Sequence, residues 1–247
     1  MSGEESSAAP ADRRRFASTR WSVVRAAQVN GDEGGARALA ELCETYWYPL
    51  YAFLRRQGRT AEDASDLVQA FFAALLEQST LEAADPARGR FRSFLLASLK
   101  HFAANEHRRA AALRRGGGAS IISLDLATAE SRYQLEPTHN LTAERVFERR
   151  WALLLLEQTL ARLRQEHVEA GKERQYAVLK DCLEGGNAAS YRELGEQLEM
   201  SEGAVKAAVY RLRRRYRELL LDEVAQTVDS EEEIADELRR LFAALDD

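Results

Sequence analysis

The residues best suited to chemistry form a basic segment near the C-terminal end of the sequence. Between residues 201 and 217, six Arg or Lys residues face one acid, Glu202. Ser190 and Glu193 have the spacing of a capping box and predict a short helix, which a turn at Met200 separates from a longer helix. Two helices joined by a short turn are typical of a helix-turn-helix, whose second helix reaches base edges and phosphates. The pattern predicts a DNA-binding surface.

Small and apolar residues support this interpretation. Gly195 lies where two crossed helices must approach closely, and Val205, Val209 and Leu212 provide a buried stripe on the second helix. Glu199 lies at a turn position that favours Gly, and we expect a cost of roughly 1 kcal/mol for its left-handed backbone. An ordinary helical hairpin with a solvated basic face is the alternative. The candidate DNA contacts are Ser201, Glu202, Gly203, Lys206, Tyr210, Arg211, Arg213 and Arg214.

Charge is strongly segregated along the chain, although the net charge is only −5. A second basic segment, residues 88–115, contains eight Arg or Lys residues against Glu106. Residues 222–247 contain ten acids against Arg239 and Arg240. Two basic segments and an acidic tail indicate a protein with two nucleic-acid contacts.

The elements that must position these residues are all helical. The chain has 247 residues and only four prolines, with apolar residues at three-to-four spacing and no sustained alternation. We expect helices over 36–57, bent near Pro49, then after Thr60, over 91–109, and from Thr142 to about Gly171. The predicted organisation is a disordered leader (1–18), a helical domain (19–112), a flexible linker (113–141), a helical domain (142–222) and an acidic helical tail (223–247).

Several classes of function are excluded at this point. Cys43 and Cys182 are far apart and form neither a disulfide framework nor a zinc motif, so we expect two buried thiols. The four histidines lack ligand neighbours, and no nucleophile has a paired base, so we expect no metal, no cofactor and no enzymatic activity. The longest apolar run, Trp151–Leu156, is too short to span a membrane, and without a secretory signal a cytoplasmic location is expected.

At this stage the sequence resembles a known family in three places. Residues 190–213 resemble region 4 of bacterial sigma factors. Residues 63–72 resemble region 2.2, and residues 91–109 resemble regions 2.3 and 2.4. Their order, with a linker between them, is similar to the layout of the small extracytoplasmic-function (ECF) class of the sigma-70 family.

The resemblance implies a specificity subunit of RNA polymerase. The residues that would dock on core RNA polymerase, at the clamp helices of its β′ subunit with the β subunit nearby, are Asp63, Asp66, Leu67, Gln69 and Phe72. Ala70 departs from the acid usual in the family. The residues that would open and hold the −10 element of promoter DNA are Arg88, Arg90, Arg92, Lys100, His101, Asn105, Arg108 and Arg109. Region 4 would hold the −35 element, and the linker would thread toward the polymerase channel.

Aromatic residues interleave with the cations of the −10 segment, as stacking on opened bases requires. We nevertheless expect at least two of Phe91, Phe94 and Phe102 to be buried, because Phe is more often a core residue.

The acidic tail predicts an amphipathic helix. Ser230 and Glu233 have capping-box spacing, and an apolar stripe follows at Ile234, Leu238 and Leu241. The tail is expected to fold back on the C-terminal domain, to bind a regulator such as an anti-sigma protein, or to mask the basic recognition helix. A plain packing helix is the alternative.

Two other classes of function stay open. A stand-alone helix-turn-helix regulator would bind an operator without polymerase, but it has no need of the acidic 63–72 helix beside a basic aromatic one. An enzyme acting on nucleic acid would need a carboxylate or His constellation, which the sequence lacks.

Overall fold

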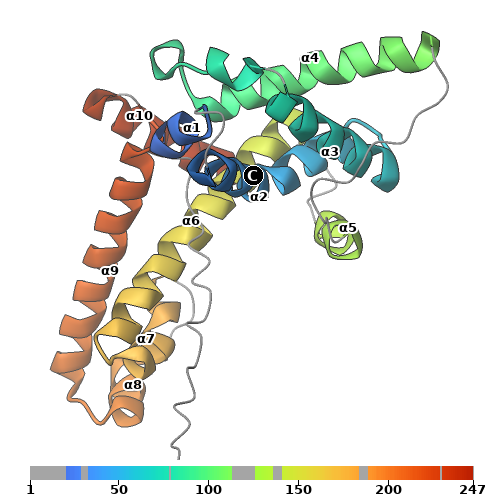
Figure 1. Cartoon of the computed structure of the whole chain (residues 1–247). Coiled ribbons are helices and arrows are strands. Elements are labelled where there is room, and N and C mark those ends of the chain that lie inside the picture. The colour runs from blue at the N-terminus through green and yellow to red at the C-terminus, as the bar shows by residue number, and fades with distance from the viewer. Residues whose placement is uncertain are drawn as a thin grey trace, which may run out of the picture.

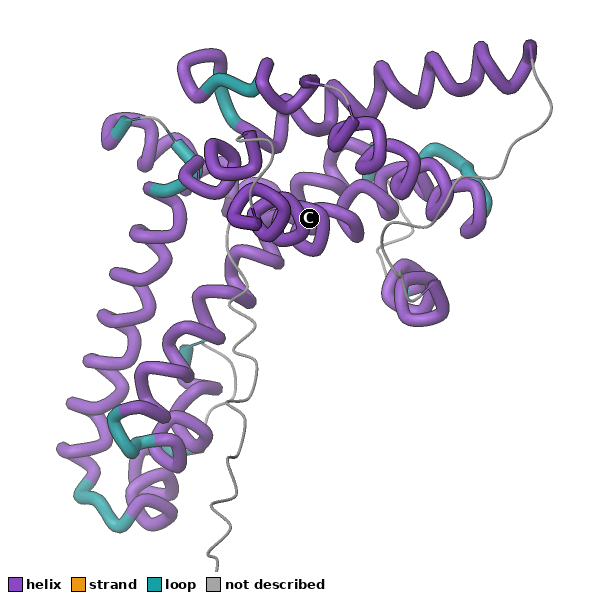
Figure 2. Tube along the Cα trace, in the orientation of Figure 1, coloured by secondary structure: helices purple, strands orange, loops and turns teal. Residues whose placement is uncertain are grey.

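The computed structural model describes residues 21–28, 33–77, 79–112, 126–135, 141–183, 189–228 and 230–246, without the side chains of 76–80, 107–112 and 126–127. The regular structure in these ranges is entirely helical, which confirms the predicted all-α class (Figure 2). The predicted leader, residues 1–18, lies outside the described residues. The α-helices are α1 (Trp21–Gln28), α2 (Glu33–Arg56), α3 (Ala61–Glu77), α4 (Phe91–Ala112), α5 (Leu126–Gln134), α6 (Ala143–Glu169), α7 (Glu173–Leu179), α8 (Tyr191–Leu198), α9 (Glu202–Ala225) and α10 (Ile234–Leu245). Short 3-10 helices are η1 (Ser79–Ala83), η2 (Pro86–Arg88), η3 (Lys180–Cys182) and η4 (Glu231–Glu233).

Local sequence signals place the helix ends. The Thr60 hydroxyl accepts a hydrogen bond from the Asp63 N–H at 3.1 Å and opens α3, and Thr142 caps α6 in the same way at 3.2 Å. Gly58 follows α2 with φ +87°, and Gly171 follows α6 with φ +67°. Both glycines take the left-handed backbone that ends a helix at little steric cost. The long helix from Thr142 to about Gly171 is therefore confirmed.

The apolar residues of the described chain gather in two clusters. The larger combines α1 to α4, Ala129 of α5, the first half of α6, the end of α9 and Leu241 of α10. The smaller lies between the second half of α6, α7, α8 and the first half of α9. Tyr46, Tyr51, Phe53 and Phe147 are among the largest fully buried side chains, and all four belong to the larger cluster.

Two long helices connect the clusters. From the larger body, α6 runs down to α7 and α8, and α9 runs back up beside it to α10 (Figure 1). Along α6, Trp151 and Leu155 are buried in the larger cluster and Leu163 in the smaller. Along α9, Val209 belongs to the smaller cluster and Val224 to the larger. The helix-turn-helix is thus carried at the end of an arm that shares its helices with the body.

Two helices of the structure have no counterpart in the sequence prediction. Helix α1 packs on α2, and the Gln28 side-chain amide donates to the carbonyls of Leu81 and Ala84, each at 2.9 Å. Helix α5 lies inside the interval 113–141 that was predicted as a flexible linker. Its Glu130 carboxylate accepts from Arg55 at 2.7 Å and from the Tyr51 hydroxyl at 2.7 Å, which attaches the segment to α2.

Candidate functional site

The helix-turn-helix forms as its sequence predicts. The Ser190 hydroxyl accepts from the Glu193 N–H at 3.3 Å, and the Glu193 carboxylate accepts from the Ser190 N–H at 2.8 Å. Both halves of the predicted capping box are therefore present. Ser201 then caps α9 by accepting from the Ala204 N–H at 3.3 Å.

The turn between α8 and α9 is sharp and depends on two residues. Glu199 has φ 56° and ψ 40° and is the one non-glycine residue with positive φ in the described ranges, as predicted. The Met200 N–H donates to the Gly195 carbonyl at 2.9 Å. A Cβ on Gly195 would lie 2.6 Å from the Met200 carbonyl oxygen, so only glycine permits this approach.

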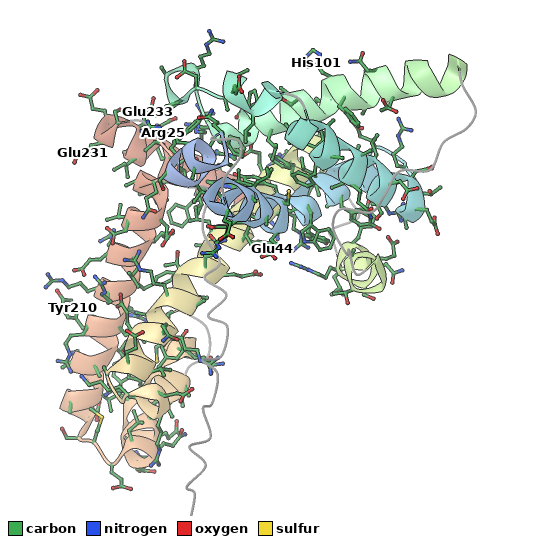
Figure 3. All side chains as sticks on the ribbon, in the orientation of Figure 1. Arg25, Glu44, His101, Tyr210, Glu231 and Glu233 are labelled. Atoms are coloured by element: carbon green, nitrogen blue, oxygen red, sulfur yellow. The ribbon has the colours of Figure 1, made fainter. Side chains whose placement is uncertain are left out.

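The exposed face of α9 supplies the candidate DNA contacts. Ser201, Glu202, Gly203, Lys206 and Arg211 are all exposed. Tyr210 is 67% exposed and projects from the outer side of α9 (Figure 3). The predicted apolar stripe of Val205, Val209 and Leu212 is buried on the opposite side.

Arg213 and Arg214 lie on the same helix but have intramolecular partners. Arg213 donates to the Cys182 carbonyl from Nε at 3.0 Å and from a terminal nitrogen at 2.7 Å, and so ties α9 to the end of η3. Arg214 pairs with Glu218 one turn on, at 3.0 Å, while its side chain stays 70% exposed. The structure therefore leaves Lys206, Tyr210 and Arg211 available as candidate DNA contacts. Arg214, which is exposed, could exchange Glu218 for a phosphate.

A structural ion pair that sequence reasoning missed holds α9 against α6. The guanidinium of Arg215 donates to both oxygens of Glu166, at 2.7 and 2.8 Å. The hydrogen bond from Arg215 lowers the pKa of Glu166, and the same bond raises the pKa of Arg215. The two residues are 49 positions apart, and no local spacing signals their contact.

Helix α3 presents the predicted acidic surface. Asp63 and Asp66 are exposed, and Leu67 and Gln69 are half-buried, with the Gln69 amide donating to the Ser65 hydroxyl at 3.3 Å. Phe72 is only 1% exposed and belongs to the larger apolar cluster. The structure therefore places Phe72 in the core under the helix, and leaves Asp63, Asp66 and the edge of Leu67 for a partner.

The outer side of α4 keeps part of the predicted −10 set accessible. Arg88 is 79% exposed and lies 3.7 Å from Asp85, and Lys100 pairs with Glu144 of α6 at 2.6 Å while staying 42% exposed. His101 and Asn105 are exposed, and His101 projects from the outer side of α4 in Figure 3. The side chains of Arg108 and Arg109 lie outside the described residues.

Arg90 and Arg92 occupy a different environment from the rest of that set. Arg92 is 4% exposed, pairs with Glu148 at 2.8 Å and with Glu237, and stacks 3.8 Å above the ring of Trp151. Arg90 pairs with Glu237 and with Asp236, the latter at 3.0 Å. Burial lowers the pKa of the Arg92 guanidinium, but Glu148 and Glu237 together outweigh it and raise that pKa. In this conformation both arginines are bound by the chain's own acids.

The aromatic residues of α4 contribute mainly to the core. Phe91 is 3% exposed and meets Trp21 and Tyr46 edge-on, with ring centroids 6.0 and 5.7 Å apart. Phe94 and Phe102 are half-buried against the same cluster. Only Phe91 is buried, so the expectation that at least two of the three are buried is wrong, and Phe94 and Phe102 retain exposed edges.

The acidic tail folds back, but its details differ from the prediction. Ser230 makes no side-chain capping bond, so the predicted capping box at Ser230 and Glu233 is wrong. Instead, α10 packs against α6 and the end of α9, and its Asp236 and Glu237 bind Arg90, just before α4, while Glu237 also binds Arg92 of α4. The acids thus lie on the −10 segment and not on the exposed recognition face of α9.

Three further features of the described residues bear on function: their thiols, their metal-ligating groups and the apolar length of their helices. Cys43 and Cys182 are free and buried, as expected, and burial with the nearby Glu44 raises the pKa of Cys43 to about 12. Among the described residues, no group of three His, Cys, Asp or Glu is placed to hold a metal ion. None of their helices is long and apolar enough to cross a membrane.

The comparisons with known proteins identify the body of the molecule. Residues 42–113 match the family model for sigma-70 region 2, which corresponds to most of α2 and all of α3 and α4. This segment therefore belongs to the sigma-70 region 2 family, which supports a role of the chain in transcription initiation. Neither the curated proteins nor the solved structures give a match to this chain.

Proposed function

We propose that this chain is an alternative sigma factor of the ECF type, which binds core RNA polymerase and directs it to promoters with −35 and −10 elements. The observation that carries the proposal is the combination of a sigma-70 region 2 with a complete helix-turn-helix downstream of it. In this role the polymerase catalyses and the chain supplies promoter recognition.

The surface of α3 suits a basic partner. Asp63 and Asp66 are exposed one helical turn apart, beside the half-buried Leu67. Among the described residues neither aspartate has an ion-pair partner in the chain. Exposed acids steer association with a basic surface, and a neighbouring apolar edge anchors it once docked. We infer that this face of α3 contacts the β′ clamp helices.

Two separate surfaces suit DNA. On α9, Lys206 and Arg211 flank Tyr210 on the exposed face, a composition that fits the phosphates and bases of a duplex −35 element. Arg88 of η2 and Lys100 and His101 of α4 are exposed, and Phe94 of α4 is half-buried, a composition that fits an opened −10 strand.

A binding experiment with bacterial core RNA polymerase tests the proposal. Asp66→Lys reverses one charge on α3 and should weaken association of the full chain with core polymerase about tenfold, which equals ~1.4 kcal/mol. Glu157→Lys is the matched control, because Glu157 is also exposed on a helix, α6, outside the proposed contact. Equal affinities of wild type and both variants, or no association at all, would reject the proposed docking.

A further inference from the structure

A buried ion cluster joins the C-terminal helix to the start of α4. The carboxylate of Glu237 is completely buried, and its two oxygens accept from Arg90 and Arg92, one oxygen to each. Asp236 adds a second acid to Arg90 at 3.0 Å, and Glu148 of α6 adds one to Arg92 at 2.8 Å. Two guanidinium groups are thus paired with three carboxylates, two of them from α10.

The chemistry of this contact resembles that of a phosphate. A carboxylate whose two oxygens bind two different arginines presents the same charge-assisted acceptors as a phosphodiester group. Arg90 and Arg92 lie within the segment that the sigma-70 region 2 match includes, at the start of the helix with the exposed Lys100 and His101. Nucleic acid that follows α4 toward its N-terminal end therefore meets α10 at these two arginines.

The rest of the α10 contact is apolar and mostly half-buried. Besides Glu237, Leu241 is the one residue of α10 that is fully buried. Leu238 and Leu245 are half-buried, and Phe242 is 51% exposed. Arg149 adds one hydrogen bond to the Leu245 carbonyl at 3.0 Å. Helix α10 is therefore held by the ion cluster, by the buried Leu241 and by half-buried apolar side chains that pack on the larger cluster, namely Ile234, Leu238, Ala244 and Leu245.

We propose that α10 is an intramolecular competitor of nucleic acid, in which Asp236 and Glu237 occupy Arg90 and Arg92 until a single strand displaces them. The inference rests on the proposed function in one respect, because it assumes that region 2 holds a single-stranded −10 element. It differs from masking of the recognition helix, since the exposed face of α9 keeps Lys206, Tyr210 and Arg211 accessible. Release of α10 frees Arg90, whereas Arg92 keeps its pair with Glu148 of α6.

The test removes the two charges without shortening the chain. Asp236→Asn/Glu237→Gln keeps the shape of both side chains, and Glu231→Gln/Glu232→Gln is the control, because it removes two exposed acids of η4 that lie outside the cluster. Binding of a fluorescein-labelled 20-nucleotide single strand of random sequence is followed by anisotropy from 50 to 200 mM salt. The first pair should bind more tightly, and its log–log salt slope should steepen by about 0.7, for the one phosphate contact that is freed at Arg90.

The control distinguishes the proposal from a general charge effect. If both variant pairs tighten binding equally, or neither changes the slope, α10 is a structural helix and the proposal is overturned. Hydrogen exchange of residues 234–245 in the wild-type chain provides a second measurement, because exchange should accelerate when the single strand saturates the protein. Unchanged protection would contradict displacement. Neither measurement contains polymerase, so failure here leaves polymerase binding to be judged by its own experiment.

Discussion

The close contact between Gly195 of α8 and Met200 in the following turn gives the sharpest prediction about the fold of the helix-turn-helix. A Cβ at Gly195 would lie 2.6 Å from the Met200 carbonyl oxygen and 3.6 Å from Cγ2 of Val205. The first contact is with backbone, so it cannot be relieved by rotating a side chain. Gly195→Ala must therefore move the turn that sets the angle between the two helices.

The magnitude follows from two opposing effects. Overpacking a close contact costs typically about 1–3 kcal/mol, and we expect about 3 kcal/mol here because the contacted backbone atom is rigid. Replacing Gly by Ala in a helix returns roughly 1 kcal/mol through helix propensity. The expected net loss is about 2 kcal/mol. Gly203 is the matched control, because a Cβ there meets nothing within 4 Å, and Gly203→Ala should gain about 0.5–1 kcal/mol.

Native-state hydrogen exchange measures this effect where it acts. The free energy of opening for amides of α8 and the first half of α9 should fall by about 2 kcal/mol in Gly195→Ala and rise slightly in Gly203→Ala, with the amides of α2 unchanged. Duplex DNA affinity should fall in Gly195→Ala, and Gly203→Ala is the control for stability alone, because Gly203 is itself a candidate DNA contact. The reasoning is refuted if Gly195→Ala is as stable as wild type, or if both alanine variants lose stability to the same extent.

Three further outcomes follow from single contacts. Glu199→Gly should raise the free energy of opening of the same helices by roughly 1 kcal/mol, because it relieves the left-handed backbone at φ 56°, and a fall would contradict that cost. Arg211→Ala should reduce the log–log salt slope of duplex DNA binding by about 0.9, whereas Arg213→Ala should leave the slope nearly unchanged and loosen η3, because Arg213 is bound to the Cys182 carbonyl. The hydrogen bonds from Arg55 and Tyr51 lower the pKa of Glu130, so the stability that this carboxylate contributes is present above the ordinary Glu pKa and is lost as the pH falls through the lowered pKa. Hydrogen exchange of the α5 amides should therefore accelerate in that acid range. Glu130→Gln should remove this pH dependence.

Local signals in the sequence were sufficient for most of the helices and for the helix-turn-helix. The capping box at Ser190, the left-handed turn at Glu199 and the close approach at Gly195 each depend on residues within a few positions of one another. Such features can be predicted from the sequence because their physical causes are local. Helix α1 has a similar local signal, the spacing of Trp21, Val24 and Ala27, which are all buried on one side of the helix.

Long-range contacts account for what the sequence did not predict. Arg92 and Glu237 are 145 positions apart, and in the sequence each belongs to a charged segment that is indistinguishable from a solvated surface. Phe72 has the helical spacing of an exposed anchor as well as that of a core residue, and only the packing of α3 on the body decides between them. Burial of a charged side chain depends on which segments meet in space, so no local pattern identifies it.

Mapping transcription start sites in a reconstituted system tests the central claim most directly. Bacterial core RNA polymerase is mixed with the full chain and fragmented genomic DNA from the source of the chain, and the 5′ ends of the transcripts are sequenced. Initiation at discrete sites that share paired upstream elements, only when both polymerase and chain are present, is the expected result. Transcript ends unchanged by the chain, together with binding of the chain alone to a duplex operator, would contradict the account.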